Sequence, residues 1–335
     1  MKEVILGQAV DPTLPIVVCG AGGFIGGHLV RDLVGRGHTQ VRAVDVKPLN
    51  DWWQVVDGVE NLQLDLSQKS AAYEALEGQS HVYNLAADMG GMGFIENNKA
   101  LCMLSVLINT HLLLAARDNG AERYFFASSA CVYNVEKQKT HDVEPLKEED
   151  AYPALPEDGY GWEKLFSERM CRHFREDFGL ATRIARYHNV YGPSGSWRGG
   201  REKAPAALCR KVAEVKLGLK DKILIWGDGE QARSFMYVDD CVLGTQLLMH
   251  SEHEHPINIG SSEVVSINDL VSIIESIAGT VVPREYDVSK PQGVAGRSSD
   301  NTRIREVLDW EPQISLEDGL HETYEWIVGQ ISATS

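Results

Sequence analysis

The chain is poor in cysteine and in basic residues, and both shortages exclude classes of protein. Its 335 residues hold six cysteines, with neither the Cys-x-x-Cys pairs of a zinc site nor the density of a disulfide-stapled domain. There are 32 Lys and Arg residues against 48 Asp and Glu, a net charge of −16 that argues against general nucleic-acid binding. We expect no metal site, and any anionic ligand must be met by a local cluster of cations.

The chain also lacks long hydrophobic runs. No stretch approaches the roughly 20 consecutive apolar residues that a membrane span requires, and the N-terminus has no basic segment followed by an apolar core. We therefore expect a cytoplasmic protein without membrane association. No internal repeat or low-complexity segment is present. With 43% hydrophobic residues, the chain can bury a large core in one domain or two.

Short apolar runs alternate with helical patterns along the first half of the chain. The predicted strands are residues 16–20, 39–45, 80–85, 123–128 and 181–187, with another ending at Asp65. The predicted helices fill the gaps, notably over 23–36, 98–119 and 160–178. Because parallel strands need a connection of about a dozen residues or more, this pattern predicts an α/β fold with a Rossmann-type doubly wound parallel sheet. Beyond residue 190 the patterns shorten and prolines recur, which predicts a smaller mixed α/β region.

A glycine-rich loop joins the first strand to the first helix, where the pyrophosphate of a dinucleotide would rest. Its glycines permit close backbone approach, and the helix N-terminus offers N–H groups to phosphates. Asp45 ends the second strand, where a carboxylate would bind a ribose 2′-hydroxyl and repel a 2′-phosphate, which favours NAD over NADP. Asp65 is a candidate for contacting adenine and equally for capping the next helix. The predicted cofactor contacts in this part of the chain are Gly20, Gly23, Phe24, Ile25, Gly26, Asp45 and Asp65.

A tyrosine and a lysine four residues apart form a candidate redox centre with a serine. Tyr160 and Lys164 share one face of a predicted helix, so an ammonium beside the phenol would favour the phenolate and make a base for alcohol oxidation. Both would also contact the cofactor. Ser129, at the ligand-binding end of the fifth strand, could hydrogen-bond the same hydroxyl. Taken alone, a tyrosine and a lysine four residues apart more often lie on the surface of a helix, and a glycine-rich loop is more often an ordinary turn. The occurrence of both with Ser129 favours a redox centre.

At these residues the chain resembles the extended short-chain dehydrogenase/reductase family. The marks of that family are a GxxGxxG loop, a serine followed by a YxxxK pair, and a sugar-nucleotide substrate. Further segments narrow the resemblance to its GDP-mannose 3,5-epimerase branch: residues 87–95, 127–133, 188–193, 199–207 and 226–235. The likeness runs from Ile16 to Trp326 and is dense in loops, where function is commonly placed.

The resemblance implies a reaction and an acid/base pair. Bound NAD would oxidise C4 of the mannose ring to a ketone, which acidifies the C–H bonds at C3 and C5, and would then restore the alcohol. Cys131 would be the base and Lys203 the acid that returns the proton, with GDP-L-galactose and GDP-L-gulose as products. The alternative without catalysis is that Cys131 is a small buried hydrophobic residue and that Lys203 is a solvated surface lysine. The basic segment 197–211 in an acidic chain favours a diphosphate site.

By the same resemblance, a set of positions would contact the sugar nucleotide. They are Gly90, Ser129, Ala130, Cys131, Asn189, Glu202, Lys203, Ala204, Lys211, Gln231, Arg233 and Arg297. The chain departs from the family pattern at Asn134, where proline is expected, and over 215–223, which looks longer than usual. These departures affect loop shape more than chemistry.

The resemblance also implies how the chain is organised. We expect an NAD-binding Rossmann domain over residues 1–189, with 235–255 returning to it, and a smaller sugar-nucleotide-binding domain over 190–335. The helices from Asn98 and from Tyr160 would pair across a two-fold axis and form a homodimer.

Three other functions compete with this interpretation. A sugar-nucleotide 4,6-dehydratase should carry an Asp-Glu pair near Ala130 and Cys131, which is missing from the sequence. A 4-epimerase needs only the redox centre, and it leaves Cys131 and Lys203 without a role. A catalytically inactive NAD-binding regulatory protein would have no need of an intact redox centre.

Overall fold

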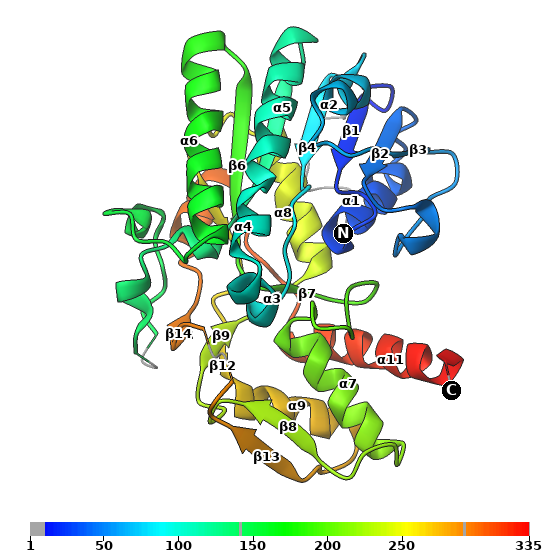
Figure 1. The fold of residues 1–335 in the computed structure, drawn as a ribbon, viewed down its shortest axis with the longest axis vertical. Coiled ribbons are helices and arrows are strands. Elements are labelled where there is room, and N and C mark those ends of the chain that lie inside the picture. The colour runs from blue at the N-terminus through cyan, green and yellow to red at the C-terminus, as the bar shows by residue number, and fades with distance from the viewer. Residues whose placement is uncertain (1–10, 141–142, 291–292, 335) are drawn as a thin grey trace.

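A seven-stranded parallel sheet forms the centre of the computed structural model, which describes residues 11–140, 143–290 and 293–334 (Figure 1). The strand order is β11-β6-β5-β4-β1-β2-β3. The strands are β1 (Ile16–Cys19), β2 (Val41–Asp45), β3 (Glu60–Gln63), β4 (His81–Asn84), β5 (Arg123–Ser129), β6 (Ala181–Tyr187) and β11 (Ile257–Ile259). Strands β2 and β3 lie on one side of β1, and β4, β5 and β6 lie on its other side. The strand order therefore reverses between β1 and β4, which is where folds of this kind bind ligands. The predicted doubly wound α/β fold is confirmed.

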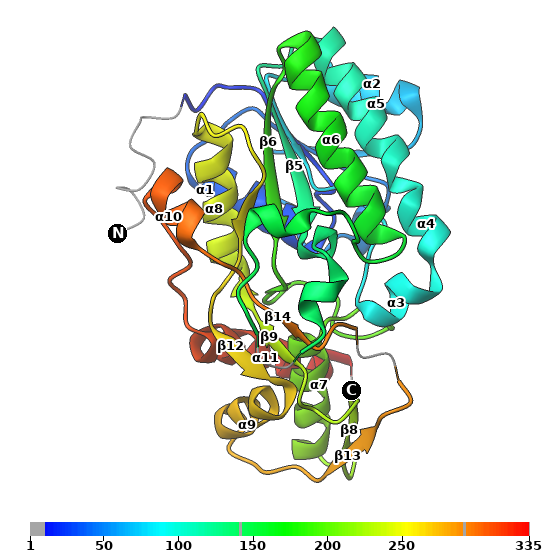
Figure 2. The ribbon, with the colours of Figure 1, turned by 90° about the vertical axis from the view of Figure 1, so that its left-hand side faces the viewer.

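Helices cover both faces of this sheet. Helices α1 and α8 lie on one face, and α2, α5 and α6 lie on the other (Figure 2). Their bounds are α1 (Phe24–Gly35), α2 (Lys69–Leu76), α5 (Ser105–Asp118), α6 (Tyr160–Phe178) and α8 (Val238–His250). Every residue of β1 is fully buried, as expected for a central parallel strand of β-branched residues that is covered on both sides.

The predicted helix over 98–119 is divided in the structure. It forms α4 (Lys99–Met103) and α5, with Leu104 at the junction. Together Lys99–Asp118 are long and apolar enough to cross a membrane by length and mean hydropathy, although polar residues interrupt the apolar stretch as expected. In the fold, α5 packs between α2 and α6 and its inner residues are buried, so the segment belongs to the core of the α/β layer.

A buried ion pair fixes α6 to the middle of the sheet. The Glu168 carboxylate on α6 accepts hydrogen bonds from Arg186 Nε at 2.9 Å and Nη2 at 2.7 Å on β6. It also accepts one from the Ser128 hydroxyl on β5 at 2.5 Å. A bidentate pair of this kind fixes orientation, and it sets the N-terminal end of α6 beside the carboxyl end of β5. That juxtaposition brings the predicted redox residues together.

A second, smaller region lies at the carboxyl end of the main sheet. Helices α7 (Ala204–Lys216), α9 (Ile267–Ala278) and α11 (Leu316–Thr334) pack on one another at the bottom of Figure 1. Its short strands are β8 (Ile223–Trp226) with β13 (Arg284–Asp287), β9 (Ala232–Ser234) with β12 (Val264–Ser266) and β14 (Gly296–Arg297), and β7 (Val190–Tyr191) with β10 (Met236–Tyr237). The chain returns to the main sheet through α8 and β11, where α10 (Thr302–Leu308) packs beside β11. The part of the chain that packs against the main sheet therefore extends past residue 255, the expected end of the segment 235–255.

Candidate active site

The glycine loop after β1 has the shape of a dinucleotide cradle. Gly20 has a φ of +86°, and a Cβ there would lie 2.9 Å from the backbone of Ala86. A Cβ on Gly26 would lie 2.2 Å from the Gly20 carbonyl oxygen, so only glycine lets the first turn of α1 approach the loop this closely. Gly23 is the N-cap residue of α1, its backbone is extended, and it has no side chain that could accept a hydrogen bond from the helix. The N–H groups of Phe24 and Ile25 can therefore donate to a phosphate. The loop therefore fits NAD.

The two predicted nucleotide carboxylates lie in different settings. Asp45 ends β2 and is buried, and its Oδ1 accepts a hydrogen bond from the Lys47 backbone N–H at 3.0 Å. Asp65 is exposed two residues beyond β3, where it accepts from the Ser67 N–H at 3.0 Å. A hydrogen bond with the Ser67 side chain is the main cause that lowers its pKa, and the backbone hydrogen bond adds to the lowering. The N-cap of α2 is Gln68, so the helix-capping interpretation of Asp65 is wrong.

Ser129, Tyr160 and Lys164 meet at the carboxyl end of β5. Ser129 ends β5, and its hydroxyl accepts a hydrogen bond from the Cys131 N–H at 3.2 Å. Tyr160 begins α6, and Lys164 Nζ lies 5.5 Å from the centre of its ring. The Glu163 carboxylate lies 3.6 Å from the same ammonium. The i, i+4 spacing therefore places phenol and ammonium on one buried face, as predicted.

The expected lowering of the Tyr160 pKa is not found in the protein alone. Burial raises that pKa well above its ordinary value, and the charges of Cys131 and Glu163 act in the same direction, whereas a hydrogen bond with Ser129 opposes them. Desolvation disfavours the phenolate more strongly than the surroundings stabilise it. The oxidised nicotinamide ring of NAD is cationic, and when bound beside Tyr160 it would act in the opposite direction to burial and favour the phenolate.

Cys131 lies beside the redox centre with an arginine against its sulfur. It follows β5 in the short helical turn Ala130–Val132, and it packs with Tyr160, Phe94 and Met89. Arg297 Nη1 is 3.8 Å from Cys131 Sγ, although the two residues are 166 positions apart. Burial raises the pKa of the thiol to about 11, the charge of Glu157 adds to this effect, and Arg297 opposes it.

Lys203 faces the same space from the smaller region. It is the N-cap residue of α7, directly before Ala204. Burial lowers the pKa of its ammonium, and the charge of a Cys131 thiolate acts against that effect, so the two groups are close enough to interact. The lowering has the direction expected for a desolvated lysine, which is the property that a proton-returning acid would use.

The loop after β4 closes the cleft against the segment before α7. A Cβ on Gly91 would lie 2.6 Å from the Glu202 carbonyl oxygen, and the Gly91 N–H donates to the Arg201 carbonyl at 3.1 Å. Gly90 is buried against Phe94. These glycines thus allow two chain segments to touch, an explanation that the sequence did not suggest.

The basic segment 197–211 is largely neutralised by its own neighbours. Arg201 pairs with Asp88 at 2.8 Å, and Arg210 pairs with Glu214 at 3.0 Å. Glu202 accepts from the Gly200 N–H at 2.6 Å. Lys211 Nζ donates to the Leu224 carbonyl on β8 at 2.6 Å. The expected cluster of diphosphate-binding cations is therefore engaged in internal contacts in the protein without ligand.

The remaining predicted substrate positions lie on or directly before short strands at the carboxyl end of the main sheet. Arg233 and Arg297 are register partners on β9 and β14, and burial lowers the Arg233 pKa to about 10, with Arg297 contributing. Gln231 is buried and donates to the Trp226 carbonyl at 3.4 Å. Asn189 has a φ of +36° and donates to the Ser234 carbonyl at 3.1 Å. Asn134, where the family pattern has proline, donates to the Pro153 carbonyl at 2.9 Å.

Two residues at the site escaped the sequence analysis. Glu157 pairs with Arg297 through Nη2, and Gln138 Oε1 accepts from Arg297 Nε at 2.6 Å. They are 140 and 159 positions from Arg297. No local pattern connects such positions; the one available signal was a carboxylate three residues before Tyr160.

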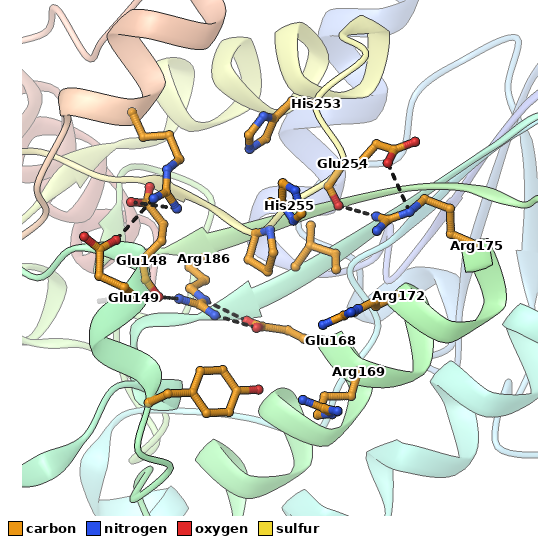
Figure 3. Close-up of a pocket in the computed structure, with 14 residues that line it drawn as sticks. Glu148, Glu149, Glu168, Arg169, Arg172, Arg175, Arg186, His253, Glu254 and His255 are labelled. Atoms are coloured by element: carbon orange, nitrogen blue, oxygen red, sulfur yellow. Dashed lines mark hydrogen bonds and ion pairs between the residues drawn. The ribbon is translucent and has the colours of Figure 1, made fainter. Parts of the chain in front are cut away.

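A separate cavity of about 470 Å³ lies beside the C-terminal half of α6, and none of the predicted site residues lines it. Several of its arginines pair with carboxylates, as Figure 3 shows for Arg186 with Glu168 and for Arg175 with Glu254. Arg303 pairs with Glu148 at 3.3 Å. The charges of these three arginines are therefore balanced within the protein.

Comparisons with known proteins agree with this geometry. The model of the NAD dependent epimerase/dehydratase family matches residues 16–260. GDP-mannose 3,5-epimerase 1 of Oryza sativa subsp. japonica is 46% identical over 319 residues, which cover 95% of this chain and 82% of that protein.

Solved structures share the whole architecture. UDP-glucose 4-epimerase of Thermotoga maritima, in complex with UDP-glucose, has a TM-score of 0.85 and 25% identity, covering 95% of this chain and 100% of that one. A variant of UDP-glucuronic acid 4-epimerase from Bacillus cereus, bound to NAD and a fluorinated sugar nucleotide, has a TM-score of 0.81 and 26% identity, covering 95% of this chain and 100% of that one. The chain therefore belongs to the NAD-dependent epimerase/dehydratase family, and GDP-mannose 3,5-epimerases are among its relatives there.

Proposed function

We propose that this chain is an isomerase that epimerises GDP-mannose at C3 and C5 to GDP-L-galactose and GDP-L-gulose. The observation that carries the proposal is the meeting of Cys131, Lys203 and Arg297 beside Ser129 and Tyr160. A 4-epimerase needs only the serine and the tyrosine. The 46% identity to a GDP-mannose 3,5-epimerase, against 25% to a UDP-glucose 4-epimerase, supports the same choice.

NAD supplies the hydride chemistry at C4 of the sugar. Gly20, Gly23, Phe24, Ile25 and Gly26 would hold its pyrophosphate, and Asp45 its ribose. Tyr160 would take the proton of the C4 hydroxyl and later return it. Ser129 would orient that hydroxyl, and Lys164 would favour the phenolate. Once C4 is a ketone, the protons at C3 and C5 become acidic.

The acid/base pair must be charged before it can epimerise. Burial raises the pKa of Cys131 and lowers that of Lys203, so burial acts toward the neutral form of each group. Moving the proton from Cys131 Sγ to Lys203 Nζ breaks the S–H bond, forms an N–H bond and gives a thiolate facing an ammonium. The thiolate then removes a proton from one face of the ring, and the ammonium returns one from the other. Arg297 stabilises the thiolate.

The two regions of the fold would divide the ligands between them. We infer that residues 1–189 with 235–255 hold NAD and that residues 190–335 hold the sugar nucleotide. The side chains of Asn189, Glu202, Lys211, Gln231 and Arg233 would bind the nucleotide and its diphosphate. The internal partners of the basic segment would then be exchanged for phosphate oxygens. We place this enzyme in the cytoplasm.

We also infer that the chain forms a homodimer through the outer faces of its long helices. Leu101, Leu104 and Leu107 on α4 and α5 are exposed, as are Trp162 and Phe166 on α6. Helices α4, α5 and α6 pack side by side, so these five apolar side chains form one surface, the helix face. Contiguous apolar surface of this kind marks an interaction site.

The proposed reaction is tested by incubating the purified protein with GDP-mannose in deuterated water. Deuterium at C3 and C5 with new GDP-hexose epimers, read by NMR and mass, is expected. Both signals should disappear in Cys131→Ala and Lys203→Ala while NAD stays bound. Inversion at C4 without deuterium at C3 or C5 would contradict the proposal and indicate a 4-epimerase. Failure of any sugar nucleotide to react would indicate a regulatory NAD-binding protein.

A further inference from the structure

We propose that Glu157 is a positioning residue for the Cys131 base: its carboxylate holds the Arg297 guanidinium against the sulfur and keeps the thiol protonated in the resting enzyme. This inference rests on the proposed function only for the role of Cys131 as a base. The state of the thiol itself can be measured without any sugar nucleotide.

Glu157 is attached to Cys131 in two independent ways. Its backbone N–H donates to the Cys131 carbonyl at 3.0 Å, which fixes the segment before α6 to the turn after β5. Its Oε1 accepts from Arg297 Nη2, while Arg297 Nη1 lies 3.8 Å from Cys131 Sγ. The three residues therefore form a closed loop in which the carboxylate orients the guanidinium and the guanidinium faces the sulfur. Gln138 holds the third side of that guanidinium through Nε at 2.6 Å.

The second oxygen of Glu157 explains how the carboxylate acts on the thiol. Glu157 Oε2 is buried and has no hydrogen bond of good geometry among the described residues. Burial raises the pKa of Glu157, but Arg297, a hydrogen bond with the Cys131 thiol and the charge of Arg233 together lower it below its ordinary value, so the carboxylate is ionised. A buried carboxylate oxygen without a donor is costly, and a thiol S–H turned toward it supplies one.

Opposite charges therefore act on one sulfur. Burial raises the pKa of Cys131 to about 11, and the negative charge of Glu157 is the next cause in the same direction. Arg297 opposes both. Since the thiolate is the form that alkylating agents and oxidants attack, a carboxylate that holds the proton on sulfur protects the base between turnovers. A side chain of the same shape without charge would remove that restraint.

The test compares Glu157→Gln with the wild-type protein. Glutamine keeps an oxygen for Arg297 but carries no charge. We measure alkylation of Cys131 by iodoacetamide across a pH series, reading the peptide that contains this residue by mass spectrometry. The midpoint of the rise with pH should move to lower pH, so that at mildly alkaline pH the variant reacts about tenfold faster for each pH unit by which the midpoint falls. A change in access alone would scale the rate at every pH and leave the midpoint in place.

Asp158→Asn is the matched control. Asp158 is the neighbouring carboxylate, but it is exposed and pairs with Lys99 at 2.7 Å, so its removal should leave the midpoint unchanged. Glu157→Asp keeps the charge and should retain slow alkylation. If the glutamine variant releases NAD or unfolds at a lower temperature, the aspartate variant still tests whether a negative charge at this position keeps alkylation slow. An unchanged midpoint in folded Glu157→Gln, or equal shifts in the glutamine and aspartate variants, would overturn the proposal.

Activity adds a separate readout. If GDP-mannose is the substrate, the pH profile of deuterium exchange at C5 should shift to lower pH in Glu157→Gln, in step with the alkylation midpoint. If GDP-mannose proves inert, the alkylation result stands by itself, so a failed substrate and a failed role for Glu157 are distinguishable.

Discussion

At the scale of single residues, the chemistry of this site depends on how much each group is desolvated. Tyr160 is the clearest case, because its pKa is raised by burial despite a lysine four residues further along the helix. The same effect raises the pKa of Cys131 and lowers that of Lys203. The sequence predicts that Tyr160 and Lys164 are neighbours, whereas the depth at which they lie shifts their protonation.

Replacing Tyr160 by phenylalanine removes the proposed proton acceptor at C4 and little else. Because a positioned acid/base group contributes about 10²–10⁴ in rate, deuterium exchange at C3 and C5 should fall by that factor while NAD remains bound. Tyr152→Phe is the matched control, since Tyr152 is exposed and lies at the separate cavity beside α6. Equal exchange in Tyr160→Phe and wild type would exclude Tyr160 as the base.

At the scale of elements, α6 is placed by one buried ion pair. Glu168 connects this helix to β5 through Ser128 and to β6 through Arg186. The Glu168–Arg186 ion pair therefore holds α6 in the position that brings Tyr160 beside Ser129.

Glu168→Gln should consequently destabilise the protein strongly. The substitution leaves the buried Arg186 charge without its carboxylate, and breaking a buried pair costs about 3–5 kcal/mol. Urea unfolding followed by circular dichroism measures the change. Glu176→Gln breaks the exposed Arg172 pair on the same helix and should cost less than about 1 kcal/mol. Similar losses in the two variants would show that the buried pair does not hold α6.

At the scale of the whole molecule, two properties depend on the complete fold. The first is assembly through the helix face. Phe166→Glu places a charge in that face and should convert a dimer into a monomer, because burying an unpaired carboxylate is costly. Light scattering after gel filtration at micromolar concentration measures this. Leu219→Glu, at a similarly exposed apolar residue in the smaller region, should leave the dimer intact. A wild-type monomer would refute the inference.

The second property is sensitivity to acid. Burial lowers the pKa of His81 to about 4, of His253 to about 4 and of His188 to about 3, from an ordinary value of 6.5. The folded protein keeps these imidazoles neutral, while the unfolded chain takes up protons near 6.5. Stability should therefore be constant above that pH and fall as pH drops from 6.5 towards 4, by at most about 1.4 kcal/mol per pH unit for each histidine.

Urea midpoints measured across this range test the prediction, and His81→Gln should make the loss less steep. A flat profile between pH 6.5 and 4 would show that these histidines are solvated in the native state.

Local signals in the sequence determined the class of fold and the candidate cofactor and redox residues, whereas the acid/base pair and the substrate positions were expected from the family resemblance. The β-branched run of β1, the glycines of the following loop and the i, i+4 spacing of Tyr160 and Lys164 each act within one turn or strand, so they are readable along the chain. The bounds of α6 and β6 agree with the predicted segments for the same reason. The break at Leu104 was not predicted because the helical pattern continues through this position and gives no sign of an interruption.

Only the tertiary structure decided which distant residues meet and how strongly they are desolvated. The three-residue strand β11 joins the edge of the main sheet far along the chain, and Arg297 reaches Cys131 across 166 positions. Glu157 becomes significant only through that contact. Pairings of this kind are set by the packing of whole elements, and the burial that raises or lowers a pKa is a property of that packing, so neither is encoded in any local stretch of sequence.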